Sequence, residues 1–188
     1  MAFATLVVGV APAHAAAQPV RFAEPASLAD AFRSLTRTAQ TVDIAPPEPD
    51  EWFPVRGVID FGAYDARFGA WRGDRKHEGQ DVFAEAGTPL VAIRDGEVVE
   101  TGDDGGRGNY VAIWSPDTDR TFLYLHMRAP SPLQPGDPVA GGARVGAVGC
   151  TGSCWGDHLH LEMRAGRGTT GVPLDPLPLL SRLARRAR

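Results

Sequence analysis

The sequence lacks three features that mark other classes of protein. Its longest apolar run, residues 1–13, is well short of the roughly 20 residues that a membrane-spanning helix needs. No internal repeat at solenoid or propeller spacing is present. A basic stripe is also missing, because residues 51–175 carry 18 acidic against 12 basic side chains. We therefore do not expect a membrane span in the mature chain, a repeat architecture or a nucleic-acid partner.

The N-terminal residues have the composition of an export signal. Residues 1–13 are almost wholly apolar, and Ala13-His14-Ala15 has the small-x-small pattern of a cleavage site. No Lys or Arg precedes the apolar run, and a buried N-terminal strand or helix is the alternative. We predict a signal peptide over residues 1–15 and a secreted, extracytoplasmic protein.

Length and composition predict one domain, which we expect to be monomeric. The chain has 188 residues, 43% of them hydrophobic, which is enough for one core and not comfortably for two. Helical spacing of apolar residues predicts a short helix over 28–40, followed by a Pro-rich linker, so that residues 16–50 precede the domain. The domain is predicted over residues 51–180, with a basic, solvated tail over 181–188.

The pattern of the domain predicts an all-β fold made of one compact antiparallel β-sheet domain. Short apolar runs alternate with turn formers, and the chain contains 22 Gly and 16 Pro. Little helix is expected between residues 52 and 175. The predicted strands are 88–93, 97–100, 109–114, 121–127, 145–148 and 158–163. Asp95-Gly96 predicts a hairpin that joins the first two of these strands.

Histidine is scarce, and its placement is informative. Of five histidines, His14 lies in the predicted signal, and the others are His77, His126, His158 and His160. In an extended strand, positions 77, 79 and 81 share a face, so His77 and Asp81 would point the same way. Gly79 between them would leave space for a metal ion.

A second cluster follows the same alternation. His158 and His160 would share one face of a strand, while Leu159 and Leu161 enter the core from the other. Catalytic zinc takes three His, Asp or Glu ligands and keeps a fourth position for water. His77, Asp81 and one His of the pair would meet that count, and the leftover His and His126 would serve as acid, base or oxyanion donor. Unrelated surface or core histidines are the alternative.

Two cysteines and one acid flank this cluster. Cys150 and Cys154 precede His158, and in an exported protein a disulfide is the favoured interpretation. A structural Cys/His zinc site and free thiols are the alternatives. Glu162 would lie on the same face of the strand as His160, so it would either orient that histidine or be a solvated acid at the strand end.

Four stretches together resemble the lysostaphin- and LytM-like zinc endopeptidases. They are Phe61-Gly62 with His77 to Asp81; Gly87 to Ala92 with Asp95-Gly96; Tyr124 to Met127; and Gly149 through Thr151-Gly152 to Asp157–Glu162. The closing Leu174-Asp175-Pro176-Leu177 is also similar to the end of that family. The resemblance covers about two-thirds of the chain in the right order. Gln80 and Leu125 replace commoner residues, and neither is a ligand.

The resemblance implies a fold, a site and a substrate. The fold is the duplicated hybrid motif, a LytM-like barrel-sandwich. The ligands of one Zn²⁺ per chain would be His77, Asp81 and His160, with His126 and His158 as the catalytic histidines. The implied substrate and partner is bacterial peptidoglycan, cut at cross-links or stem peptides, which places the protein at the cell wall. Two alternatives are a catalytically silent wall-binding or hydrolase-activating module and a carbohydrate- or lipoyl-like β carrier domain.

Overall fold

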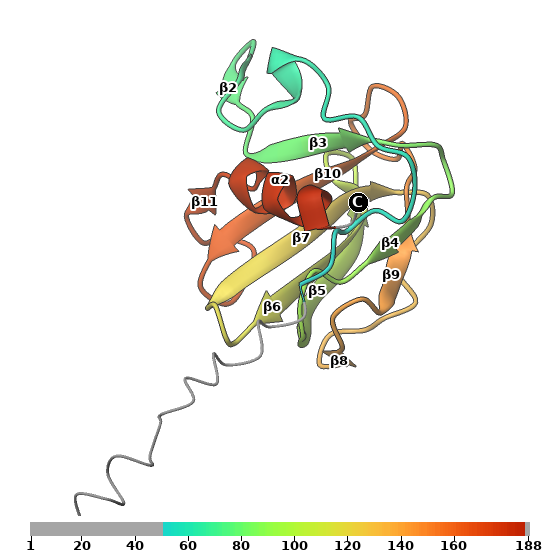
Figure 1. Ribbon diagram of the computed structural model, residues 1–188, viewed down its shortest axis with the longest axis vertical. Helices are drawn as coiled ribbons and strands as arrows, with labels where there is room; N and C mark the ends of the chain where they lie inside the picture. Colours follow the sequence, from blue (N-terminus) through green and yellow to red (C-terminus); the bar gives the residue numbers. More distant parts are fainter. Residues whose placement is uncertain (1–50, 187–188) are drawn as a thin grey trace, which may run out of the picture. The chain divides into compact units, whose positions relative to one another are not determined.

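The structure is a computed structural model that describes residues 51–186. Within this range the all-β prediction is confirmed: the chain forms antiparallel sheets and one α-helix (Figure 1). The predicted signal peptide over 1–15 and the helical segment and linker over 16–50 lie outside the described residues.

The elements are short and follow one another closely. In chain order they are η1 (Tyr64–Ala66), β1 (Trp71–Arg72), β2 (Arg75–Lys76), β3 (Gly79–Phe83), β4 (Pro89–Val91), β5 (Gly96–Asp104), β6 (Gly108–Ser115), β7 (Arg120–Met127), β8 (Pro138–Val139), β9 (Arg144–Ala147), β10 (His158–Ala165), β11 (Pro173–Leu174) and α2 (Leu177–Arg186). The predicted strands at 109–114, 121–127 and 158–163 correspond to β6, β7 and β10.

The main sheet has seven strands, and β10 is the strand that organises the site. The order is β11-β10-β7-β6-β5-β8, and β3 also pairs with β10. The partners of β10 on its open edge change along its length: β3 pairs with His158–Glu162, and β11 pairs with Met163 and Arg164. Its other edge pairs with β7. The N-terminal half of β10 is thus held between two strands distant in sequence.

The larger hydrophobic core lies on one face of the main sheet, and a smaller buried cluster of Tyr110, Ala112, Leu123 and Leu125 is separate from it. The larger core is closed by the β4–β9 pair, by the segment that bridges to β4 at Val55, and by α2. Leu159 and Leu161 of β10 are fully buried in it, as their alternation with the histidines predicts. The histidines of β10 consequently occupy the opposite face of the sheet.

Two sequence-based expectations differ from the structure. The hairpin predicted at Asp95-Gly96 is wrong, because β4 pairs with β9 while β5 pairs with β6 and β8. Asp95 instead accepts a hydrogen bond from the Gly141 amide at 2.7 Å, so it ties two loops together. The second difference concerns the C-terminus, since the boundary predicted at residue 180 falls inside α2.

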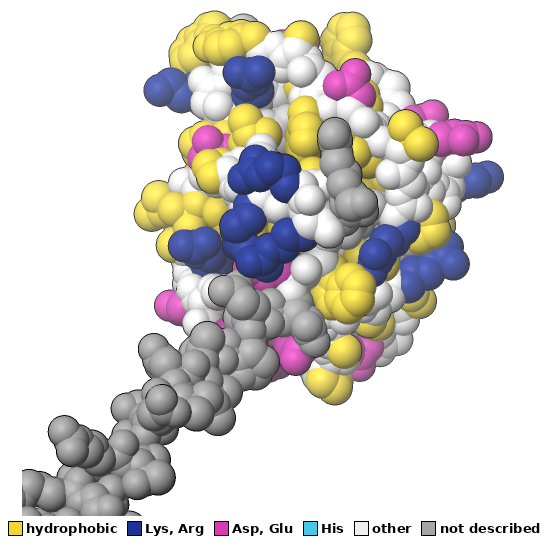
Figure 2. Space-filling view, in the orientation of Figure 1, with side chains coloured by type: hydrophobic (Ala, Val, Ile, Leu, Met, Phe, Trp, Pro, Cys, Tyr) yellow, Lys and Arg dark blue, Asp and Glu magenta, His cyan; other side chains and the backbone are white. Residues whose placement is uncertain are grey.

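Helix α2 is packed on the domain, although residues 181–188 were predicted to be a solvated tail. Leu180 and Leu183 are buried in the core, and Arg182 forms an ion pair with the buried carboxylate of Glu51. Figure 2 shows this face, with Lys and Arg side chains gathered over α2. Arg residues on the outer side of an amphipathic helix look like a basic tail in the sequence, because only packing reveals the apolar stripe between them.

The packing of α2 predicts a large stability difference between two of its residues. Leu183→Ala should lower the free energy of unfolding by about 2–5 kcal/mol, because it leaves a cavity in the core. Arg185→Ala, at an exposed position of the same helix, should change it by less than about 0.5 kcal/mol. Denaturant titration of both variants measures the difference, and equal stabilities would show that α2 is not part of the core.

Candidate metal centre

The strand pairing brings Asp81 and His160 together. They are direct cross-strand partners in the β3–β10 pair, with Asp81 Oδ1 and His160 Nδ1 2.8 Å apart. His77 lies in the connection between β2 and β3, outside any strand, and its Nε2 is 2.9 Å from His160 Nδ1 and 3.2 Å from Asp81 Oδ1. Three side-chain atoms from two distant segments of the sequence therefore converge on one point.

Outer contacts orient each of these side chains. His77 Nδ1 donates to the Arg67 carbonyl at 2.9 Å, which leaves Nε2 with its lone pair toward Asp81. His160 Nε2 donates to Glu162 Oε1 at 3.3 Å, which directs Nδ1 to the same point. Such contacts fix the tautomer and the ring orientation of metal-binding histidines.

The convergence of three electron-pair donors requires positive charge at their centre. All three side chains are buried. Burial opposes ionisation of Asp81, but hydrogen bonds with His160 and His77 outweigh it and hold the pKa of its carboxyl far below the usual range. Burial likewise opposes charge on His160, yet its bonds to Asp81 and Glu162 raise its pKa. The site is thus built to hold a cation among these atoms, either a proton or a metal ion.

The donor set fits zinc. The edges of a tetrahedron with zinc bond lengths are roughly 3.3 Å, close to the separations of 2.8, 2.9 and 3.2 Å found here. Two imidazoles and one carboxylate are a known catalytic zinc set with an open fourth position. A second group, His126, His158 and His160, is also close enough to hold a metal. We favour the first group because it includes an ionised carboxylate to balance the charge.

Gly79 has a different role from the one expected. The sequence suggested that it leaves space for a metal ion, but a Cβ at this position would lie 2.6 Å from the Leu161 carbonyl oxygen and 2.7 Å from His160 Nε2. The His160 ring and the neighbouring strand occupy that space. Gly79 therefore permits β3 to approach β10 closely and lets the His160 ring lie over the strand.

His126 reaches the site through an irregularity in β7. The pairing of β6 with β7 shifts register between Asn109 and Val111, and His126 has a left-handed φ of 60°. A non-glycine residue in this region is strained and needs support from its surroundings. The support comes from the His126 amide, which donates to the Arg107 carbonyl at 2.9 Å. The ring then lies 5.1 Å from that of His158, centroid to centroid.

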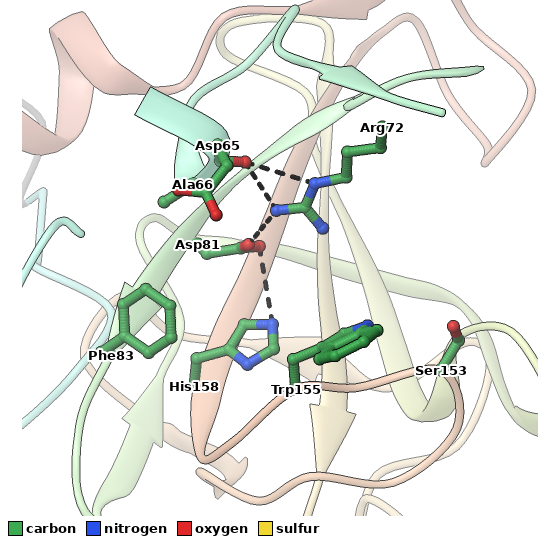
Figure 3. A pocket seen from close by; sticks show the side chains of 8 residues that line it. All are labelled: Asp65, Ala66, Arg72, Asp81, Phe83, Ser153, Trp155 and His158. Atoms are coloured by element: carbon green, nitrogen blue, oxygen red, sulfur yellow. Dashed lines mark hydrogen bonds and ion pairs between the residues drawn. The ribbon is translucent and has the colours of Figure 1, made fainter. Parts of the chain in front are cut away.

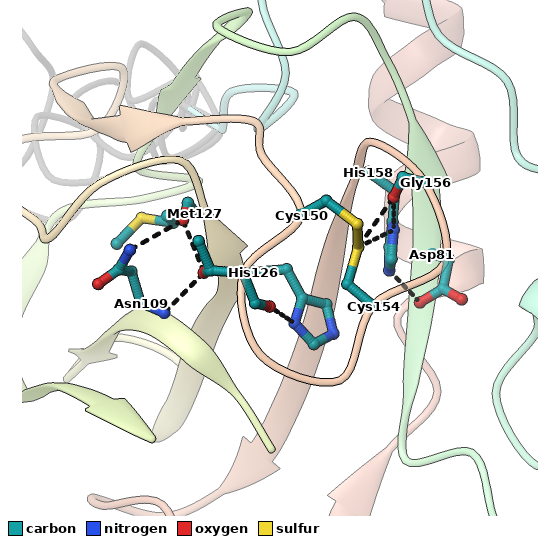
Figure 4. The surroundings of a disulfide bond; sticks show 9 residues. Asp81, Asn109, His126, Met127, Cys150, Cys154, Gly156 and His158 are labelled. Carbon is teal, nitrogen blue, oxygen red and sulfur yellow. Dashed lines mark hydrogen bonds and ion pairs between the residues drawn. A yellow bond between two sulfur atoms is a disulfide. The ribbon is translucent and has the colours of Figure 1, made fainter. Parts of the chain in front are cut away.

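The loop before β10 holds both remaining histidines. His126 Nδ1 donates to the Thr151 carbonyl and His158 Nδ1 to the Gly156 carbonyl, each at 2.8 Å. A disulfide joins Cys150 to Cys154 within this loop, as predicted (Figure 4). Both rings therefore keep Nε2 free to face the ligand set, and His158 Nε2 lies 3.5 Å from Asp81 Oδ1.

Burial keeps these two imidazoles neutral. It lowers the pKa of His126 to about 4, assisted by the neighbouring His160. Burial also lowers the pKa of His158, against the opposing effect of its bond to Gly156. Near neutral pH both rings therefore carry an unprotonated nitrogen that can accept a proton.

An open cleft of about 500 Å³ leads to this cluster (Figure 3). Asp81, Phe83 and His158 lie toward its floor, and Arg72 and the 90% exposed Trp155 lie at its sides. Arg72 forms an ion pair with Asp81 through Oδ2, the carboxylate oxygen that faces away from the histidines.

Sequence reasoning named all five side chains of the cluster and, apart from Glu162, missed the groups that orient them. Arg72 binds Asp81, and Arg164 binds Glu162 through Nε at 2.9 Å. Neither arginine could be found from the sequence, because its spacing from the ligands follows no helical or strand periodicity. Backbone carbonyls such as those of Thr151 and Gly156 carry no sequence signal at all. The sequence left two roles open for Glu162, orienting His160 or lying in solvent, and the structure places it against His160.

Comparison with known sequences identifies a family. The sequence model described as Peptidase family M23 matches residues 75–176, which is more than half of the chain. The matched segment contains His77, Asp81, His126 and both histidines of β10.

Curated relatives and solved structures agree with this match. The chain is 41% identical over 103 residues to the DD-carboxypeptidase/endopeptidase Mpg of Neisseria meningitidis serogroup B, covering 55% of this chain and 22% of the relative. It is 33% identical over 105 residues to the glycyl-glycine endopeptidase ALE-1 of Staphylococcus capitis, covering 55% and 29%. The chain thus spans less than a third of these relatives. The catalytic domain of lysostaphin from Staphylococcus simulans superposes with a TM-score of 0.57 at 28% identity, covering 65% of this chain and 92% of that domain.

The two candidate ligand groups predict different effects on metal content. If His77, Asp81 and His160 hold zinc, alanine at any of these positions should remove the metal, whereas His126→Ala should retain about one zinc per chain. Elemental analysis of the purified variants after dialysis measures this. Loss of zinc from His126→Ala, with retention in His77→Ala, would instead favour the group formed by His126, His158 and His160.

Proposed function

The chain belongs to Peptidase family M23, and from this membership we propose that it is a zinc-dependent endopeptidase that hydrolyses peptide bonds of bacterial peptidoglycan. The observation that carries the proposal is the arrangement of side chains around Asp81, which lines the cleft together with His158. His77, Asp81 and His160 form a three-donor set, and the neutral His126 and His158 face it. Two relatives named as endopeptidases, Mpg and ALE-1, support the same reaction class.

We assign the binding of one Zn²⁺ to His77, Asp81 and His160. Zinc at such a site acts as a Lewis acid and lowers the pKa of a water molecule to about 7. Arg72 and Glu162 keep two of these ligands in place, because each binds the side of the ligand that faces away from the shared point.

We assign proton transfer to His126 and His158. Each holds its Nδ1 proton on a loop carbonyl, so its Nε2 can take a proton from the attacking water and return one to the leaving amine. A protonated imidazole next to a scissile carbonyl also stabilises the developing negative charge. Because the two rings lie side by side, the pair can divide these tasks between them.

The proposed location is outside the cytoplasm, at the cell wall, and the proposed form is a monomer. The disulfide of the loop before β10 supports an oxidising compartment, where such bonds persist. Within residues 51–186 the single helix is too short to span a bilayer. The proposed signal peptide over residues 1–15 would provide the export route.

A catalytically silent wall-binding module on the same fold is the second candidate. It would need no complete set of ligands and proton-transfer groups, yet all five side chains are present and oriented by hydrogen bonds. A lipoyl-like carrier domain would likewise have no use for four converging histidines. The completeness of the set favours the enzyme.

Digestion of peptidoglycan separates the enzyme from the silent module. The zinc-loaded wild type should release new amino termini, a chelator should stop the reaction, and added zinc should restore it. His158→Ala should retain zinc but release fragments about 10²- to 10⁴-fold more slowly, because it lacks a proton-transfer group. Equal release by the wild type and by zinc-loaded His158→Ala would favour the silent module. Mass spectrometry of the fragments identifies the bond that is cut.

The disulfide predicts a separate effect on turnover. The closed loop contains Thr151, which holds His126, and Gly156, which holds His158, follows it by two residues. The double substitution Cys150→Ser with Cys154→Ser should therefore lower the rate about tenfold or more with unchanged zinc content. A phosphine reductant, which is not a thiol ligand for zinc, should slow the wild type similarly and leave the double variant unaffected. An unchanged rate after reduction, with two thiols titrated, would show that the loop keeps its shape without the bond.

A further inference from the structure

We propose that Arg72 is a specificity-determining residue that binds a free carboxylate on the substrate, on the carbon that carries the leaving amine. This inference rests on the proposed function and deepens it, because it names the kind of peptide bond that the cleft favours. A peptide bond of this kind joins an acyl residue to an amino acid whose own α-carboxylate is not in amide linkage.

The hydrogen bonds of Arg72 leave one edge of its guanidinium available. Nε and Nη2 donate to the Asp65 carbonyl at 3.2 and 2.8 Å, and Nη2 also binds Asp81 Oδ2. Nη1 has no hydrogen-bond partner among the described residues, and Figure 3 shows it directed into the cleft, toward the side where His158 and Trp155 lie. The side chain is 33% exposed, so the group is held in place and still open to a ligand.

The position of this nitrogen matches the geometry of the substrate. Asp81 bridges the two features, since its Oδ1 belongs to the ligand set and its Oδ2 binds Arg72. The guanidinium is therefore one carboxylate group away from the point where the scissile carbonyl must lie. An α-carboxylate of the leaving residue is only two bonds from the scissile nitrogen, so it falls within reach of the same region.

The donors of the cleft offer a place for an anionic group at this position. Arg72 is the only Lys or Arg among the residues that line the cleft, and its Nη2 pairs with Asp81 while Nη1 is directed into the cleft. Asp65 is the other acid there, and it offers no donor to a substrate carboxylate. A guanidinium that is pre-oriented by two protein acceptors loses little freedom when it binds a carboxylate.

Recognition of a free carboxylate distinguishes the two kinds of bond that appear in the names of the relatives Mpg and ALE-1. A bond within a glycyl-glycine bridge has no free carboxylate on its amine side. A carboxypeptidase substrate has one by definition, and a cross-link to a D-amino acid with a free α-carboxylate has one as well. The cleft of this chain therefore favours substrates with a DD-type bond over substrates with a glycyl-glycine bond.

The test compares two peptides that differ in a single group. Both contain a D-alanyl bond to a D-amino acid, whose α-carboxylate is free in one peptide and a carboxamide in the other. The zinc-loaded full chain should show a higher kcat/KM for the free acid. Arg72→Gln should reduce this preference by about 10- to 100-fold, the effect of losing one charge-assisted hydrogen bond.

Arg75→Gln is the matched control. Arg75 is the cross-strand partner of Arg72 in the same two-stranded sheet, is exposed, and does not line the cleft. It should keep the preference of the wild type, although the charge change is identical. Zinc content is measured for each protein, so that a loss of metal is separated from a loss of recognition.

The ratio of the two rates distinguishes recognition from a purely structural role. If Arg72 only positions Asp81, Arg72→Gln will slow both peptides equally, and the unchanged ratio would overturn the inference. A wild type that cleaves acid and carboxamide equally, or that digests peptidoglycan and cleaves neither peptide, would also overturn it. Failure of the zinc-loaded wild type to release any fragment from peptidoglycan is a different result, because it removes the proposed function itself.

Discussion

The close pairing of β3 with β10 is the constraint on which the candidate site depends. It makes Asp81 and His160 cross-strand partners, and a one-residue slip would send one of the two to the opposite face of the sheet. Gly79 permits the approach because any larger residue would meet the His160 ring and the backbone of β10. Packing of Leu159 and Leu161 into the core then fixes the register, so the apolar face of β10 determines the geometry of its polar face.

A shell of hydrogen bonds converts this pairing into a site with defined chemistry. Each histidine of the cluster has one ring nitrogen committed to an acceptor outside the cluster: a carbonyl of the chain for His77, His126 and His158, and a carboxylate for His160. The other nitrogen then has to face the shared point. The local strain at His126 follows from the same requirement, because a regular β7 would not direct its ring there.

The sequence was informative about the strands in which apolar and polar residues alternate. Alternation in β10 predicted which residues face the core and which face the site, and the strands predicted over 109–114 and 121–127 correspond to β6 and β7. The hairpin between β4 and β5 was wrong because a turn signal identifies a change of direction and not the partner of the strand that follows. The α2 helix was missed because its three arginines hide a stripe of two buried leucines.

The sequence by itself determined the residue types of the site, the all-β class and the family resemblance, since these depend on identities and spacing within short segments. Only the tertiary structure decided that His77 and Asp81 meet His160 and that Arg72 binds the far oxygen of Asp81. It also decided that the loop before β10, which contains the disulfide, orients two histidines. The physical reason is that these contacts join segments far apart along the chain, some through backbone carbonyls. Their geometry is set by strand register and core packing, which no local pattern of residues encodes.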